Sequence, residues 1–403
     1  METCVFQPAD ILLPADTDMT RWSVIACDQY TADAAYWERV EQTVGDAPST
    51  LRLMLPEYYL GKCDEAEQMA HIQSTMHTYL DSGLFRTLWH SFVYVERSLS
   101  DGSVRRGLVG QVDLEAYDFS PNSHSSIRAT EGTVASRLPP RVQVRAKAAL
   151  EMPHIMLFVN DSSDSIMTQA GALAGETVYD FDLMLGGGHV TGRRICGASA
   201  DALARLLAAQ TEKDAMQFAV GDGNHSLAAA RQFWLKKREQ LPPTLWEREP
   251  ARYALVELVN IHDPAITFAP IHRALFRTDP VPFFREAEAA LSDPTASRRV
   301  TLLASGVQKQ ISVKGSSIGS VIDRVEQFCK AYVAQHGGEI DYIHGDQETI
   351  ALSSAPDAAG VLLPLMDKEE LFSSVAQTGP FPKKSFSIGL GPDKRYYLEC
   401  RRI

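Results

Sequence analysis

The sequence lacks the features that mark several large classes of protein. None of its hydrophobic runs approaches the roughly 18 apolar residues that cross a bilayer. Acidic residues stand near its start, where a secretory signal would carry Lys or Arg. Its six cysteines form no CxxC pair, so neither a disulfide framework nor a zinc knuckle is indicated. We therefore expect a cytoplasmic protein that does not enter a membrane.

Positive charge is also scarce. The chain of 403 residues carries 39 Lys and Arg against 51 Asp and Glu, a net charge of −12. Such a chain repels the phosphate backbone of nucleic acids, so we do not expect nucleic acid as its main partner. The net charge does not exclude a local basic pocket. Apolar residues make up 45% and charged residues 22%, the usual proportions of a folded globular protein with a sizeable core.

Short apolar runs that alternate with helical patterns predict an α/β protein with mixed sheets and flanking helices, and a mixed α+β arrangement stays open. Two alternating runs flank Asp101-Gly102, a dipeptide suited to a tight hairpin turn. Pro139-Pro140 opens a helical pattern that leads into a buried-looking strand over 154–161. We expect an N-terminal α/β part over 1–265 and a C-terminal α/β part over 266–403. No low-complexity linker marks the exact boundary between them.

The most informative stretch is QFAVGDGNHSLAAARQFWLKK, a strand that passes into a helix through a glycine-broken turn. A helix N-terminus offers backbone N–H groups and a positive dipole end, so anions bind there. An alternative is an ordinary helix cap, in which a side-chain oxygen satisfies those N–H groups. The candidates for phosphate binding in this turn are Gly221, Gly223, Asn224 and Ser226, with Asp222 suited to a metal and His225 to phosphate or proton transfer.

A second candidate group lies upstream, in IRATEGT and the arginines that follow it. Phosphoryl transfer needs positive charge around the moving oxygens, and arginine supplies that charge without titrating. Glu131 suits the activation of a hydroxyl or water, or the coordination of Mg2+. The alternative is a solvated basic helix face and a loop cap. The candidates here are Arg128, Thr130, Glu131, Thr133 and Arg141.

Two further pairs are candidates for binding. Asp28 and Gln29 follow the first predicted strand, where ligands collect in open α/β sheets, and we assign them to the substrate. His272 and Arg273 could reach a phosphate, although a His-Arg pair after proline is also common in turns. Cys27 would be a nucleophile only if its thiol pKa were lowered, which nothing in the sequence indicates.

Five separated stretches form a recognisable pattern, namely SVIACDQYTAD, IRATEGTVASRLPPRVQVRAKAALEMPHIMLFVND, GDGNHSLAAARQFW, NIHDPAITFAPIHRALF and KKSFSIGLGPDKRYYLECRRI. Together they resemble domain-of-unknown-function family 1015, and the resemblance covers essentially the whole chain. Members of that family commonly carry Asp-Gly-His-His-Arg at the turn, so Asn224 and Ser226 depart from the family pattern and remove an arginine clamp. The family turn is similar to that of the ParB/sulfiredoxin-like superfamily, which includes free serine kinases and in which the turn cradles a nucleotide phosphate.

This resemblance implies a phosphate site at the turn and, by analogy, serine or O-phosphoserine as the leading substrate. We therefore expect a small-molecule phosphotransferase or phosphohydrolase. In it the turn and His225 hold the phosphate, Asp222 holds Mg2+, Arg128 offsets transition-state charge and Glu131 orients the acceptor. The hypothesis requires that Arg128, Glu131, Asp222, His225 and His272 converge on one pocket.

The expected partner is a small phosphorylated metabolite or nucleotide, with a nucleotide or pyrophosphate as phosphate donor. Whether the chain forms a homo-oligomer stays open. The alternative function is a non-catalytic module that senses a nucleotide or phosphate ligand and acts through a protein partner.

Overall fold

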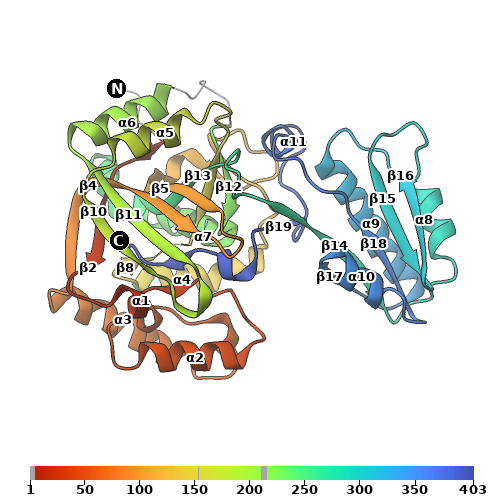
Figure 1. The fold of residues 1–403 in the computed structure, drawn as a ribbon, viewed down its shortest axis with the longest axis horizontal. Helices are drawn as coiled ribbons and strands as arrows, with labels where there is room; N and C mark the ends of the chain where they lie inside the picture. The colour runs from red at the N-terminus through yellow and green to blue at the C-terminus, as the bar shows by residue number, and fades with distance from the viewer. Residues whose placement is uncertain (1–4, 153, 210–215) are drawn as a thin grey trace.

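The computed structural model describes residues 5–152, 154–209 and 216–403. They form a larger lobe around one mixed sheet and a smaller lobe around a second sheet (Figure 1). The expected mixed α/β class is confirmed. Within these ranges no helix combines the length and the apolar composition that crossing a membrane requires. The division at residue 265 stays a prediction, and the last strands of the chain return to pair with strands of the larger lobe.

The sheet of the larger lobe runs in the order β10-β11-β4-β5-β13-β9-β12-β7-β6, with β1 paired to β5 and β2 to β4. The predicted hairpin at Asp101-Gly102 joins β4 to β5, and the buried strand predicted over 154–161 is β9. The strands are β1 (Phe6–Gln7), β2 (Ala9–Pro14), β4 (Phe85–Ser98), β5 (Val104–Asp113), β6 (Tyr117–Asp118), β7 (Ile127–Ala129), β9 (Met156–Val159), β10 (Thr177–Asp182), β11 (His189–Cys196), β12 (Phe218–Asp222) and β13 (Tyr253–Asn260).

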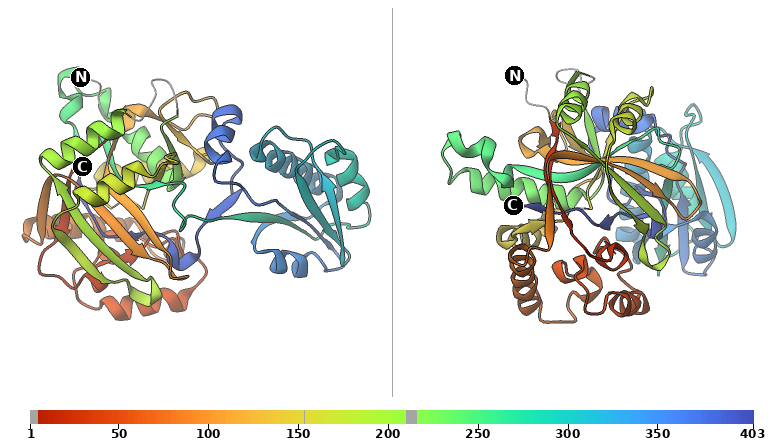
Figure 2. Two further views of the ribbon diagram at one scale, coloured as in Figure 1. Left: turned by 45° about the horizontal axis from the view of Figure 1, so that its top comes forward. Right: turned by 60° about the vertical axis from the view of Figure 1, so that its left-hand side comes forward.

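Helices cover both faces of this sheet because side chains alternate along each strand. Phe92 and Tyr94 of β4 enter a core shared with helices α4 to α7, whereas Val93 and Val95 enter a core shared with α2. In Figure 1, α5 and α6 lie above the sheet and α2 lies below it, and Figure 2 gives two further views. The helices of this lobe are α1 (Met19–Trp22), α2 (Ala34–Val44), α3 (Glu65–Asp81), α4 (Leu138–Lys147), α5 (Ser165–Leu173), α6 (Ala198–Ala209) and α7 (Asn224–Arg238).

The smaller lobe holds a sheet of order β16-β15-β18-β14-β17, and β19 pairs with the start of β14 at the junction of the lobes (Figure 1). Phe268 links the two lobes, because its ring lies 5.9 Å from that of Phe158 and 5.1 Å from that of Phe386. The elements are β14 (Phe268–Phe276), α8 (Phe283–Leu291), β15 (Arg299–Ala304), β16 (Val307–Ser312), α9 (Ile318–His336), β17 (Glu339–His344), α10 (Asp346–Leu352), β18 (Ala358–Leu362), α11 (Glu370–Thr378) and β19 (Phe386–Ile388).

The C-terminal segment returns to the larger lobe after β19. There β20 (Tyr396–Tyr397) pairs with β3 (Val24–Ile25), and β21 (Arg401–Arg402) pairs with β8 (Leu150–Glu151). The described N-terminal strands, from β1 onward, and the C-terminal strands therefore belong to the same lobe, and the residues between β19 and β20 pass close to the predicted turn.

The predicted strand is β12, the predicted helix is α7, and the predicted turn joins them. Close packing leaves little room for a side chain at either glycine of this turn. Gly223 has a φ of +79°, and a Cβ there would lie 3.0 Å from the Cα of Ile155. A Cβ on Gly221 would lie 2.5 Å from the ring of Phe158. Glycine therefore suits position 223 because of its positive φ and position 221 because of the Phe158 ring, whether or not a ligand approaches the turn.

We expect Gly223→Ala to destabilise the protein more than Gly102→Ala. The φ of Gly102 is +83°, so both substitutions carry a similar backbone penalty of about 1 kcal/mol. Only at Gly223 does the added methyl group meet a close neighbour, since nothing lies within 4 Å at Gly102. Urea unfolding of the two variants should show an additional loss of about 1 kcal/mol for Gly223→Ala. Equal losses would contradict the tight packing of the turn.

Candidate functional site

Strand pairing brings three parts of the chain to one edge of the larger sheet. β12 runs parallel to β7, with Val220 opposite Ala129, so Glu131 and Asp222 leave the sheet at the same end. β9 runs antiparallel to β12 and pairs Met156 with Asp222. His154, which precedes β9, therefore lies at this edge as well.

Helix α7 begins at this edge without a side-chain cap. The alternative in which Asn224 or Ser226 caps the helix is wrong, because Gly223 occupies the cap position and both residues lie inside the first turn. Residues 221–226 are half-buried, so the start of the helix is not sealed off. The Oδ1 atom of Asn224 and the hydroxyl of Thr133 are buried and have no hydrogen-bond partner in the described part of the chain.

Asp222 forms an ion pair with Lys394. The Oδ2 atom of Asp222 lies 3.1 Å from the Lys394 ammonium, and its Oδ1 atom accepts a 2.8 Å hydrogen bond from the Gly223 N–H. Burial by itself would raise the pKa of Asp222, but Lys394, His154 and the Gly223 N–H together hold that pKa below its usual range. Asp222 is therefore ionised near neutral pH.

Glu131 differs from Asp222 in its protonation. Burial, with a smaller contribution from the Asp222 carboxylate, raises the pKa of Glu131 to about 7, although the Ser385 N–H opposes the shift at 3.4 Å from Oε1. The backbone around Glu131 is fixed by the segment before β19, since the Phe381 N–H donates to the Thr130 carbonyl at 2.7 Å. One carboxyl at this edge is thus ionised and the other is poised to exchange a proton.

Two histidines complete the edge. His225 accepts a 3.1 Å hydrogen bond from the Val134 N–H at Nε2, so in the neutral ring the proton is on Nδ1. The Nδ1 atom of His154 lies 3.1 Å from the Tyr397 hydroxyl, and its Nε2 atom lies 3.8 Å from Oδ2 of Asp28. Gln29 donates to the Asp28 carboxylate at 3.1 Å. Asp28 and Gln29, predicted to bind substrate, therefore lie beside His154.

The neighbourhood of Cys27 is structural. Tyr397 donates its hydroxyl hydrogen to Sγ of Cys27 at 3.1 Å. Burial, together with the nearby Asp28 carboxylate, raises the pKa of the Cys27 thiol to about 12. A thiol with that pKa stays protonated, so Cys27 is not an activated nucleophile. Arg141 forms a 2.6 Å ion pair with Glu57 close to this group.

Two upstream candidates are engaged in holding the fold. Arg128 is 8% exposed and donates from Nε to the Ser125 carbonyl at 3.0 Å. Ser125 precedes β7 whereas Glu131 follows it, so this bond engages the Arg128 Nε atom at the opposite end of β7 from Glu131. The Thr130 hydroxyl donates to the Val220 carbonyl at 2.6 Å and ties β7 to β12.

His272 and Arg273 belong to the smaller lobe. The Nε2 atom of His272 lies 2.8 Å from Asp346. Arg273 is fully buried and bonds Glu326 at 2.7 Å and the Lys384 carbonyl at 3.1 Å. Neither side chain is placed to bind a phosphate at the turn. Of the five residues expected to converge, Glu131, Asp222 and His225 do, and no described contact joins Arg128 or His272 to them.

The sequence reasoning missed the contribution of the C-terminal half. Lys394 pairs with Asp222, and the pKa of His344 is lowered by burial and by the nearby charges of Lys384 and Lys394. Both lysines lie in KKSFSIGLGPDKRYY, a stretch noted for its resemblance to the family but not for its charge. His154 was not singled out, although it lies in one of the stretches that resemble the family, because it stands at the start of a predicted apolar strand.

Comparison with known proteins gives the family of the chain. The model of a family described as a protein of unknown function, DUF1015, matches residues 7–374, and the chain belongs to that family. No curated protein matches it.

Among solved structures, a free serine kinase in complex with AMP is 10% identical, with 72% of this chain and 90% of that chain covered and a TM-score of 0.39. SbnI with a C-terminal truncation from Staphylococcus aureus is 9% identical, with 70% and 82% covered and a TM-score of 0.38. A conserved hypothetical protein from Pyrococcus furiosus is 10% identical, with 71% and 92% covered and a TM-score of 0.37. Likenesses this remote do not define a function.

The raised pKa of Glu131 predicts how stability depends on pH. Between its usual value of 4.5 and about 7, the folded protein holds a proton that the unfolded chain has lost, so this carboxyl contributes stability that disappears as the pH rises through about 7. Glu131→Gln should therefore reduce the fall in unfolding free energy between pH 5 and pH 8 by about 2 kcal/mol. Urea unfolding at both pH values measures this, with the exposed Glu38→Gln as control. The same pH dependence in Glu131→Gln as in the unaltered protein would refute the assignment.

Proposed function

We propose that this member of the DUF1015 family transfers a phosphoryl group to or from a small hydroxylated metabolite, with serine or O-phosphoserine as the first candidate. One observation carries the proposal. An uncapped helix N-terminus meets a lysine ammonium and a carboxyl with a pKa of about 7 at one half-buried edge of the sheet. These are the parts that phosphate binding and proton transfer require.

The phosphate is held at the start of α7. The N–H groups of Asn224, His225 and Ser226 lie in the first turn, where the helix dipole favours an anion. The Lys394 ammonium adds a full positive charge beside the turn and offsets charge that develops on the transferring group. Lys394 thus takes over the role that the sequence analysis gave to Arg128.

Glu131 exchanges the proton of the acceptor. In transfer to a hydroxyl, the ionised Glu131 takes the hydroxyl proton while the acceptor oxygen forms a bond to phosphorus and the bond from phosphorus to the donor oxygen breaks. In the reverse direction, protonated Glu131 returns the proton to the departing hydroxyl oxygen. A pKa of about 7 suits both directions, since both forms of the carboxyl are populated near neutral pH.

Asp222 does not fit a resident Mg2+. Its Oδ1 atom accepts from Gly223 and its Oδ2 atom is paired with the Lys394 ammonium, whose positive charge disfavours a second cation at the same carboxylate. Within the described ranges no three His, Cys, Asp or Glu side chains gather into a metal-holding group. The mechanism above therefore runs through Lys394, and Asp222 acts by holding that ammonium in place.

Charge from the smaller lobe supports a nucleotide or pyrophosphate as donor. The Lys383 and Lys384 ammonium groups lie 5.7 and 5.3 Å from the ring centroid of Tyr342. Lys384 and Lys394 both act on His344, so these cations face a common region. Such a gathering in a chain of net charge −12 suits a ligand with more than one phosphate.

A second candidate is a nucleotide- or phosphate-sensing module without turnover. The contact that favours it is a direct link between the lobes, because Arg273 of β14 holds the Lys384 carbonyl and the Ser385 N–H contacts Glu131. Binding at the turn would then be transmitted to the smaller lobe and to a protein partner. Binding without chemical change of the ligand identifies this function.

Phosphorus NMR tests the enzymatic proposal. We expect a new phosphate resonance with serine plus MgATP or pyrophosphate, or with O-phosphoserine plus MgADP. Lys394→Met removes the ammonium at the turn, and Glu131→Gln removes the proton acceptor. Each should lower the rate more than tenfold and shift the melting temperature by only a few degrees.

The matched control is Lys236→Met, an exposed lysine in the last turn of α7. It should leave the rate unchanged. No new resonance with any donor, together with a ligand-dependent rise in melting temperature, would replace the enzyme by the sensing module. A normal rate in Lys394→Met would refute the assignment of the site.

A further inference from the structure

The segment that carries Lys394 is bound at every residue from 392 to 395. Arg97 donates to the carbonyls of Pro392 at 2.7 Å and Lys394 at 2.6 Å, and Arg105 donates to the carbonyl of Asp393 at 3.2 Å. The Arg395 carbonyl accepts from the Ala26 N–H at 3.0 Å. Four successive carbonyls are therefore held by the larger lobe.

The two arginines that hold this segment are buried, with 3% of Arg97 and 4% of Arg105 exposed. Burial and the neighbouring Arg105 lower the pKa of Arg97 to about 9. Such burial is costly, and apolar side chains of similar size would satisfy packing alone at least as well. What they would not supply is a set of N–H donors aimed at consecutive carbonyls of one segment.

The charges around the arginines are balanced. Arg395 pairs with Glu257 and with Glu399, and Arg105 lies 3.7 Å from Glu257. Asp393 also contributes negative charge near Arg97. Three guanidinium groups thus face three carboxylates, so the cluster needs no bound anion and its role is internal.

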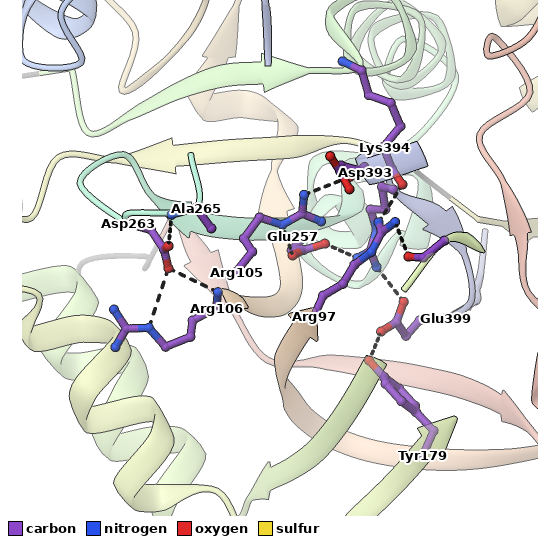
Figure 3. Close-up of polar contacts among 12 residues, drawn as sticks. Arg97, Arg105, Arg106, Tyr179, Glu257, Asp263, Ala265, Asp393, Lys394 and Glu399 are labelled. Carbon is purple, nitrogen blue, oxygen red and sulfur yellow. Dashed lines mark hydrogen bonds and ion pairs between the residues drawn. The ribbon is translucent and has the colours of Figure 1, made fainter. Parts of the chain in front are cut away.

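The side chain of Lys394 leaves this cluster. Figure 3 shows its backbone among the guanidinium groups of Arg97 and Arg105, while the side chain extends away from them. It ends 3.1 Å from Asp222 and is 17% exposed. A rigid backbone with one projecting ammonium is the arrangement expected of a group that must be placed within a fraction of an ångström.

We propose that Arg97 and Arg105 are positioning residues, which hold residues 392–395 so that the Lys394 ammonium is kept at the start of α7. The effect of this positioning on the rate of phosphoryl transfer rests on the proposed function, but the placement of Lys394 does not. Without the clamp, the ammonium spends time away from Asp222, in solvent.

Amine labelling of the full chain tests the clamp without any assumption about activity. Reductive methylation followed by peptide mass spectrometry measures the reactivity of each lysine. In Arg97→Gln, we expect Lys394 to be labelled at least fivefold faster than in the unaltered protein, because it loses both its burial and its ion pair. Lys383, which is exposed in the structure, should keep its rate and serves as the internal reference.

A matched variant separates positioning from general loss of stability. Arg252→Gln breaks an ion pair with Asp113, 2.6 Å long, elsewhere in the larger lobe. It should lower the melting temperature without changing the labelling of Lys394. Unchanged labelling of Lys394 in Arg97→Gln, or equal acceleration in Arg252→Gln, would overturn the proposal.

Arg105→Gln provides a second test if Arg97→Gln does not fold. It removes the bond to the Asp393 carbonyl and the ion pair with Glu257 but leaves both Arg97 bonds to the segment, so we expect a smaller acceleration, about twofold. No acceleration in that variant would overturn the proposal. If labelling follows these expectations but the unaltered protein transfers no phosphate, the clamp stands and the proposed function fails.

Discussion

The ion pair between Asp222 and Lys394 joins two segments that are 172 residues apart and on which the site depends. Asp222 ends the strand that leads into α7, and Lys394 lies on the segment that returns from the smaller lobe. The pair keeps Asp222 ionised, and the Asp222 charge adds to the burial that raises the pKa of Glu131. Three features are therefore coupled: the protonation of Glu131, the Lys394 charge beside the start of α7 and the path of the C-terminal segment.

Local patterns predicted the parts of the site that neighbouring residues determine. The glycine-broken passage from strand to helix was visible in the sequence, because turn chemistry and helical spacing are short-range signals. Glu131 and Asp222 were recognised separately, and the parallel pairing of β7 with β12 explains why they meet. The difference between their pKa values was not predictable, since it depends on burial and on Lys394.

Residues joined only by tertiary structure escaped prediction or were misassigned. His272 and Arg273 are residue types that often bind phosphate. As neighbours on β14 they point to opposite faces of the sheet, where His272 contacts Asp346 and Arg273 pairs with Glu326. Arg97 and Arg105 lie in segments whose sequence pattern is that of an ordinary strand. Their role depends on hydrogen bonds to backbone carbonyls almost 300 residues further along the chain. Residue types can suggest chemistry, but only the fold decides which groups are left available for it.

The most direct test of the account is to observe where a phosphate binds. Backbone amide NMR of the deuterated, fully labelled protein during titration with inorganic pyrophosphate reports each N–H separately. The account predicts that the resonances of Asn224, His225 and Ser226 shift together and saturate with one dissociation constant. Saturable shifts confined to other parts of the chain, or no shifts at all, would contradict a phosphate site at the start of α7.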